Sequence, residues 1–118
     1  MVTIEIKQEW FGDKYIPEKH EKYLGEYLVE EWNFGEREEV MELSSEQVTD
    51  DAGAIKFIVR SSKFRVNTLL KCIKNAPYKV SIANIKKMPI GVAEFLYDVV
   101  SDLNEAISGE ELKKFYEA

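Results

Sequence analysis

The chain of 118 residues, with 45% hydrophobic and 32% charged residues, has the size and composition of one globular domain with a single core. It contains no run of about 18 apolar residues, so we expect no membrane span, and its alternating start lacks the apolar region of a secretory signal. The only cysteine, Cys72, cannot form an internal disulfide and indicates a reducing, cytoplasmic location.

The net charge of −6 disfavours nonspecific binding to nucleic acid, which requires clustered Lys and Arg. Positive charge is concentrated at Lys71, Lys74, Lys79, Lys86 and Lys87, and we interpret this stretch as a solvated helix end and loop rather than a phosphate-binding surface. Glutamate and lysine dominate the charged residues and glutamine is scarce, a thermophile-like composition.

The N-terminal residues predict two strands with an irregular segment between them. Residues 2–6, VTIEI, alternate apolar and polar side chains, as a half-buried strand does. Residues 10–13, WFGD, interrupt the alternation as a turn would. Residues 14–25 are ambiguous, because Pro17 can open a short helix whereas the glycine at the end of the segment costs a helix about 1 kcal/mol relative to Ala. We favour a strand over residues 26–32.

The segment EEWNFGEREEVME predicts the junction between that strand and a helix. Asn33 is a preferred N-cap, and Glu36 stands three residues later, where the partner in a capping box belongs. The further glutamates fall in the first helical turns, where the helix dipole favours negative charge. We expect the helix to end near Gln47, and the aromatic rings of Trp32 and Phe34 to anchor the junction in the core.

A turn, a strand and a helix are predicted next. The sequence TDDAG, residues 49–53, is typical of a turn, and the alternation over residues 55–59, IKFIV, indicates another strand. Apolar residues recur at helical spacing from Val66 to Ile73, and Pro77 is expected to end that helix.

Two helices follow, and the second has the clearest pattern in the chain. Ser81 can cap a short helix, and Pro89 can occupy the first position of the next one. One face of residues 89–107 is apolar, and it consists of Val92, Phe95, Leu96, Val99, Leu103 and Ile107. Because burying such a side chain contributes about 1.5–3 kcal/mol, we expect this helix to be the centre of the core.

A last short helix is predicted at the C-terminus, where Ser108 and Glu111 form an S-x-x-E capping box. We therefore expect an α+β fold in which a small antiparallel sheet from the N-terminal half packs with a helical C-terminal half. The chain is interpreted as a single domain, residues 1–118, with a strand-rich part over 1–33, a mostly helical part over 34–107 and a short terminal helix over 108–118.

Catalytic and metal-binding constellations are missing from the sequence. His20 and Cys72 are the only His and Cys, too few for a zinc site, and nothing near either residue supports a pairing of nucleophile and base. The scattered glycines form no phosphate-binding loop, and Asp50–Asp51 lacks the alternating carboxylates of a calcium loop. We therefore predict no enzyme activity, no cofactor and no metal.

The order of short motifs along the chain is the remaining signal. E-W-x-F-G-E opens a helix, L-x-x-x-L-x-x-A-P-aromatic follows a basic or polar stretch, Ile-x-x-(Leu/Met)-Pro comes next, and an amphipathic helix ends near Leu-Asn. The matching residues are Glu31, Trp32, Phe34, Gly35, Glu36, Leu70, Ala76, Pro77, Tyr78, Ile85, Met88, Pro89, Leu96, Leu103 and Asn104. This order resembles the small tail assembly chaperones of tailed viruses and prophages. The resemblance covers residues 30–107; residues 1–25 have no counterpart, and Met88 stands where leucine is more usual.

The resemblance implies a non-enzymatic protein-binding factor in virus or prophage tail assembly. Such a factor keeps a helical tape-measure protein soluble and helps to recruit tail-tube subunits, and self-association is a further expectation. The family-marker junction consists of Trp32, Asn33, Phe34, Gly35 and Glu36. Two apolar clusters are candidate partner surfaces, Trp10, Phe11 and Tyr15 in one and Leu112, Phe115 and Tyr116 in the other, unless both simply complete the core.

Four alternatives stay open at this point. A structural tail component would remain in the finished particle, whereas a chaperone would be absent from it. An uncharacterised small interaction domain of the cytosol would have neither role. A small enzyme requires a concave pocket that holds Cys72, His20 or paired acids with perturbed pKa values. A nucleic-acid adaptor would use the stretch from Lys71 to Lys87 and bind in a salt-dependent way.

Overall fold

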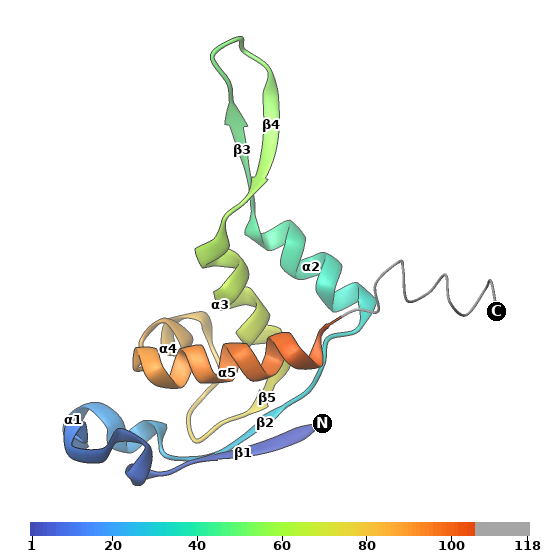
Figure 1. Ribbon diagram of the computed structural model, residues 1–118. Helices are drawn as coiled ribbons and strands as arrows, with labels where there is room; N and C mark the ends of the chain where they lie inside the picture. The colour runs from blue at the N-terminus through green and yellow to red at the C-terminus, as the bar shows by residue number, and fades with distance from the viewer. Residues whose placement is uncertain (106–118) are drawn as a thin grey trace, which may run out of the picture.

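The computed structural model describes residues 1–105, which form an α+β fold with two antiparallel sheets (Figure 1). The elements are β1 (Val2–Ile6), the 3₁₀ segment η1 (Gln8–Lys14), α1 (Pro17–His20), the 3₁₀ segment η2 (Glu21–Tyr23), β2 (Gly25–Val29), α2 (Phe34–Ser44), β3 (Ser45–Thr49), β4 (Ile55–Val59), α3 (Ser61–Cys72), β5 (Ile73–Asn75), α4 (Ile82–Lys86) and α5 (Ile90–Leu103). Ile107 and the predicted helix over 108–118 lie outside the described residues.

The main sheet has the strand order β1-β2-β5, with antiparallel pairing throughout. The register places Ile4 opposite Tyr27 and Val2 opposite Val29, so the alternating apolar residues of both strands share one face. Tyr27 and Val29 are fully buried on that face. The two strands predicted in the N-terminal part are confirmed, although β2 is shorter than residues 26–32, and Pro17 does open the short helix α1.

Gly25 begins β2 with a φ of 131°, in the region that favours glycine. A Cβ built on Gly25 would lie only 2.9 Å from the Cγ atom of Pro77, so the strand can approach the β5 loop this closely only with glycine at this position. The role of Gly25 is therefore to bring two distant segments together.

Helices α3, α4 and α5 lie beside the main sheet, and their buried residues pack with those of its strands (Figure 1). Val92, Leu96 and Val100 of α5 are 0–1% exposed and pack into one cluster with the buried residues of the sheet and of α3. The expected central position of α5 in the core is confirmed for the described residues.

Three predicted boundaries are wrong. Helix α2 ends at Ser44 rather than near Gln47, because residues 45–49 pair with β4 and the hydroxyl groups of Ser44 and Ser45 donate back to helical carbonyls. Helix α3 ends at Cys72, before Pro77, because the next three residues form β5 beside β2. Pro89 is the N-cap of α5 and not its first residue, whereas Ser81 caps α4 as predicted.

Strands β3 and β4 form a separate hairpin that projects from the ends of α2 and α3 (Figure 1). The predicted TDDAG turn closes it: Asp50 Oδ1 accepts hydrogen bonds from the backbone N–H groups of Ala52 and Ala54, and Gly53 takes a φ of 83°. The strand over residues 55–59 is confirmed, but it pairs only with β3 and does not join the main sheet.

Candidate partner-binding groove

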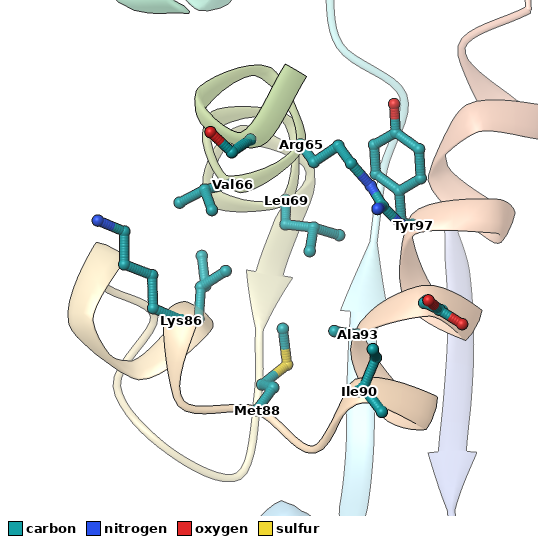
Figure 2. Close-up of a pocket in the computed structure, with 11 residues that line it drawn as sticks. Arg65, Val66, Leu69, Lys86, Met88, Ile90, Ala93 and Tyr97 are labelled. Carbon is teal, nitrogen blue, oxygen red and sulfur yellow. The ribbon is translucent and has the colours of Figure 1, made fainter. Parts of the chain in front are cut away.

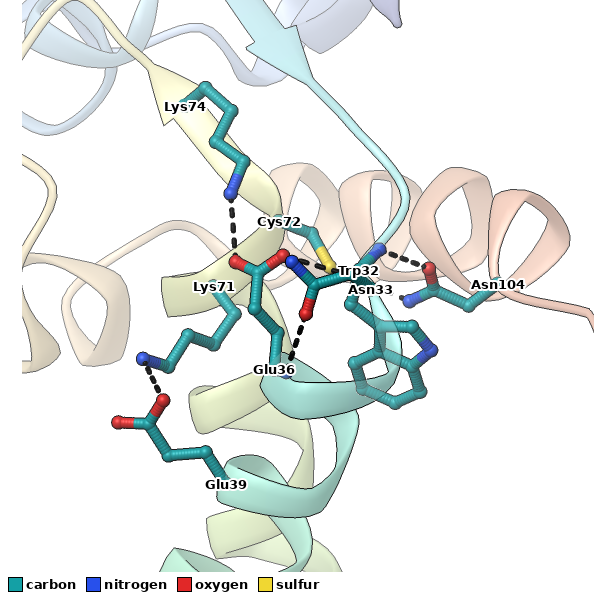
Figure 3. Close-up of polar contacts among 8 residues, drawn as sticks. All are labelled: Trp32, Asn33, Glu36, Glu39, Lys71, Cys72, Lys74 and Asn104. Atoms are coloured by element: carbon teal, nitrogen blue, oxygen red, sulfur yellow. Dashed lines mark hydrogen bonds and ion pairs between the residues drawn. The ribbon is translucent and has the colours of Figure 1, made fainter.

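The family-marker junction is a structural connection in this protein (Figure 3). The Asn33 side chain accepts from the Glu36 N–H (2.8 Å), and the Glu36 carboxylate accepts from the Asn33 N–H (3.1 Å), which is the predicted capping box. Glu36 also accepts a hydrogen bond from Lys74 Nζ (3.0 Å). The Asn33 N–H and then the Lys74 ammonium group hold the pKa of the Glu36 carboxyl below its ordinary value.

Asn104, just after α5, links this junction to the C-terminal end of that helix (Figure 3). Its Oδ1 accepts from the backbone N–H of Trp32 (2.9 Å), and its Nδ2 donates to Cys72 Sγ (3.5 Å). Two motifs of the resemblance that lie 72 positions apart in the sequence are therefore in direct contact.

The two aromatic rings of the junction differ in burial. Trp32 is half-buried, packs against the core and makes an edge contact with Phe64 (6.1 Å between ring centroids). Phe34 is 74% exposed, so its expected anchoring in the core is wrong. Phe34 is the first residue of α2, and at this position its side chain extends away from the body.

The cluster of Trp10, Phe11 and Tyr15 lies on and beside η1. Phe11 packs against the core and stacks on the His20 ring (4.2 Å between centroids), whereas Trp10 is 46% exposed and has an edge contact with Phe95. Tyr15 is half-buried and lies against Phe11, with 6.0 Å between the ring centroids. The other predicted partner surface, Leu112, Phe115 and Tyr116, lies outside the described residues.

Cys72 is 0% exposed among apolar neighbours, and burial raises the pKa of its thiol. His20 contacts other residues than Cys72: its Nδ1 accepts a hydrogen bond from the Ile16 N–H (3.0 Å), and its ring stacks on Phe11. These contacts remove Cys72 as a candidate nucleophile. Within residues 1–105, no group of three His, Cys, Asp or Glu side chains is placed to hold a metal ion.

Several basic residues pair with acids where α2, α3 and the hairpin meet. Lys71 pairs with Glu39 (2.7 Å) and Lys74 with Glu36 (3.0 Å), while Glu46 binds both Arg60 and Lys63 (2.6 Å each). The predicted solvated positive stretch is thus partly neutralised, which argues against a surface that binds phosphates along its length.

An apolar hollow lies where α3, α4 and α5 meet (Figure 2). Val66 and Leu69 of α3 face Met88 and Ala93 across a hollow of about 380 Å³. Its further lining residues are Ser62, Arg65, Ile85, Lys86, Ile90, Glu94 and Tyr97. Ile90, at the start of α5, is 75% exposed at the mouth of this hollow.

A second hollow of about 560 Å³ continues this surface on the α2 side of α3. Both hollows share Ser62, Val66 and Lys86, and the second adds Leu43 and Ile82, which are 51% and 46% exposed. We call the two hollows together the helix groove. An apolar surface of this kind beside packed helices is typical of protein-binding sites.

The helix groove has a basic rim in an acidic protein. The chain from residue 52 to residue 93 contains no Asp or Glu. Arg65 lies over the Tyr97 ring (4.7 Å to the centroid), and Lys86 has no ion-pair partner in the described part of the chain. Glu94 is the one acid among the lining residues of the two hollows.

The sequence patterns did not point to this groove. They placed Val66, Leu69 and Ile85 on helical faces and thereby in the core. Leu69 and Ile85 are buried as expected, whereas Val66 stays partly exposed between the helices. The exposed Leu43, Ile82 and Ile90 carry no signal of their own, since single apolar residues on a surface are common. The one sequence feature that indicates this surface is the absence of Asp and Glu between residues 52 and 93.

Across residues 1–105, no helix has both the length and the apolar character that crossing a bilayer requires. Comparisons of the chain with models of protein families, with curated proteins and with solved structures give no match.

Proposed function

We propose that this protein is a non-enzymatic binding factor that holds an amphipathic helix of a partner protein in the helix groove. By its resemblance to small tail assembly chaperones, we further propose that the partner is a tape-measure or tail-tube type of protein in virus or prophage tail assembly. The observation that carries the proposal is the open apolar surface between α2, α3, α4 and α5.

A helix suits this surface better than a small molecule does. The two hollows share Ser62, Val66 and Lys86, and the exposed side chains of Leu43, Ile82 and Ile90 are among the residues that line them. A partner helix with apolar residues at positions i, i+3, i+4 and i+7 presents a stripe of comparable character, and burying that stripe against the groove removes apolar area from water.

The charged residues at the rim of the groove favour a partner helix with acidic residues beside its apolar stripe. Arg65 and Lys86 favour Asp or Glu beside the apolar stripe, because opposite charges at the edge of an interface accelerate association and orient the partner. A partner with basic flanks meets these two residues unfavourably. The groove thus fits a helix that is apolar on one face and acidic at its borders.

A direct test uses two synthetic peptides that share one apolar stripe and carry either Glu or Lys at its borders. We expect the Glu peptide to bind severalfold more tightly, measured by fluorescence anisotropy or calorimetry, with a difference that shrinks as salt is added. The substitution Ile90→Glu is expected to weaken binding by about tenfold or more, because an apolar contact of about 1.5 kcal/mol is replaced by a charge.

Phe34→Glu is the matched control for Ile90→Glu. Both side chains are about three-quarters exposed, 74% for Phe34 and 75% for Ile90, but Phe34 does not line the groove. Both variants should keep the thermal stability of the parent protein. Equal binding by the two variants, or equal binding of the two peptides at low salt, would contradict the proposed groove.

The role in tail assembly predicts a tape-measure gene beside the gene of this chain, and co-expression of the two proteins in cells tests it. Co-expression should raise the soluble fraction of that protein, and Ile90→Glu should remove the effect. Mass spectrometry of purified particles should find this chain absent. Its presence in stoichiometric amounts would indicate a structural component of the tail instead.

A further inference from the structure

Arg65 differs from the other basic residues of α3, because its charge lies over an aromatic ring. Lys63 and Lys71, the other bases of this helix, each form an ion pair with a glutamate (2.6 and 2.7 Å). The Arg65 guanidinium group instead lies over the Tyr97 ring of α5, with its central carbon 4.7 Å from the ring centroid. Within residues 1–105 no carboxylate lies at ion-pair distance from Arg65.

The Tyr97 ring is held in place by the core. Tyr97 is half-buried and packs against the buried cluster, whereas Arg65 is exposed. Since α3 packs against α5, the guanidinium group and the ring come from two neighbouring helices. An arginine that stacks on the face of an aromatic ring keeps the N–H groups at its edge free. The contact therefore restricts the Arg65 side chain without using its hydrogen-bond donors.

Both residues line the helix groove, and Figure 2 shows the Arg65 side chain reaching from α3 toward Tyr97 beside Val66 and Leu69. Glu94, one turn before Tyr97 on α5, lines the same hollow but forms no ion pair with Arg65. The guanidinium group thus associates with the ring rather than with this acid, and its charge stays at the border of the apolar surface.

We propose that Tyr97 is a positioning residue of the helix groove, whose ring holds the Arg65 guanidinium group where it meets a carboxylate beside the apolar stripe of the bound helix. This role rests on the proposed function of the groove and produces part of its preference for acidic borders. A guanidinium group binds a carboxylate through two parallel hydrogen bonds. Because the Arg65 side chain is already restricted, it loses less conformational entropy on binding.

Lys86, the other base at the rim, has no such support. In the described part of the chain, its ammonium group has neither an aromatic ring beneath it nor an ion-pair partner. Lys86 therefore attracts acidic borders from a mobile side chain, whereas Arg65 acts at one fixed position. Only the contribution of Arg65 should depend on the ring.

The test is a double-mutant cycle with the two peptides that carry either Glu or Lys at the borders of one apolar stripe. Tyr97→Leu should lower the ratio of their affinities about twofold to fivefold, which is the loss expected for a cation–π contact at an exposed site. Tyr97→Phe keeps the ring and should keep the ratio. With Arg65→Ala already in place, Tyr97→Leu should leave the ratio unchanged, because no guanidinium group remains to be positioned.

Phe95→Leu is the matched control for Tyr97→Leu. It removes an aromatic ring two positions earlier on α5, at a residue that does not line the groove, and it should leave the ratio unchanged. Lys86→Ala should lower the ratio by the same factor in the parent protein and in Tyr97→Leu. If Tyr97→Leu weakens both peptides equally, or acts fully without Arg65, the ring contributes only apolar packing and the proposal is wrong.

The NMR spectrum of the free protein gives a second measurement that needs no peptide. Protons of the Arg65 side chain should show an upfield ring-current shift, which Tyr97→Leu removes and Tyr97→Phe retains. Absence of this shift would overturn the role of Tyr97. Peptides that bind and are discriminated equally well by Tyr97→Leu would overturn that role alone and leave the groove intact, whereas peptides that do not bind at all would overturn both proposals.

Discussion

The main sheet and the β3–β4 hairpin show how one sequence pattern leads to two different outcomes. Residues 2–6 and residues 55–59 both alternate apolar and polar side chains, and both form antiparallel strands. Ile6 of β1 is 1% exposed because α5 and its neighbours cover that face of the sheet, whereas Phe57 of β4 is 74% exposed. Alternation therefore predicts the pleat, and it does not predict whether anything covers the apolar face.

The difference indicates a division of roles. The body, formed by the main sheet with α3, α4 and α5, supplies the stability, because its apolar residues are covered. The hairpin contributes little buried area and leaves Ile55, Phe57 and Val59 exposed. The proposed binding function would use both kinds of region, since contact surface that is already buried cannot be used again.

The largest effect is expected from two alanine substitutions, one in the body and one in the hairpin. Leu96→Ala in the body should lower the free energy of unfolding by about 2–5 kcal/mol, because it leaves a cavity at a fully buried site. Phe57→Ala in the hairpin should change it by less than about 0.5 kcal/mol. Urea denaturation measures both values, at a protein concentration low enough to keep the chain monomeric. Comparable losses would mean that the hairpin is part of the core.

A second comparison concerns two side chains that accept hydrogen bonds from backbone N–H groups, Asn104 in the body and Asp50 in the hairpin. Asn104→Ala should cost about 1–3 kcal/mol in global stability, because the half-buried N–H of Trp32 loses its acceptor. Asp50→Ala removes the acceptor for two N–H groups in the hairpin turn. We expect faster hydrogen exchange of the β3 and β4 amides in this variant, with exchange in β1 and β2 unchanged. Faster exchange throughout the protein would show that the hairpin and the body unfold together.

The smallest effect is expected from acid titration of Glu36. Its folded-state pKa is lowered, so its stabilising contribution is present above the unfolded pKa of the carboxyl group and is lost as the pH falls through the folded value. The stability gap between the parent protein and Glu36→Gln should be below about 1 kcal/mol at neutral pH and should close in acid.

Glu46, whose pKa is lowered by Lys63 and Arg60, is the hairpin counterpart of Glu36. Glu46→Gln should change the local exchange of the hairpin but not the acid dependence of global stability. A gap for Glu36→Gln that persists unchanged at low pH would show that the carboxylate charge does not stabilise the junction.

Local features of the fold could be predicted well from the sequence. The capping box of Asn33 and Glu36, the TDDAG turn and the Ser81 cap form as expected, because each depends on side chains within a few residues. The element ends that were misplaced depend on distant partners. Residues 45–49 are a strand because β4 lies beside them, and α3 stops at Cys72 because Ile73 enters the main sheet.

The candidate site was the harder part. Trp32 and Asn33 were selected correctly as a junction, yet their contact with Asn104 spans most of the chain and could not be read from spacing. The helix groove was missed because helical periodicity assigns a residue to the inner face of its own helix and gives no information on the gap between helices.

The sequence by itself determined the α+β class, strands β1, β2 and β4, helices α2 to α5, the caps of α2 and α4, the hairpin turn and the central apolar stripe of α5, because these follow from propensity and periodicity over short distances. Only the tertiary structure decided which apolar stripes are covered, where α2 and α3 end, and that a groove remains between the helices. Burial depends on which distant elements meet, and their packing is settled by the whole chain at once.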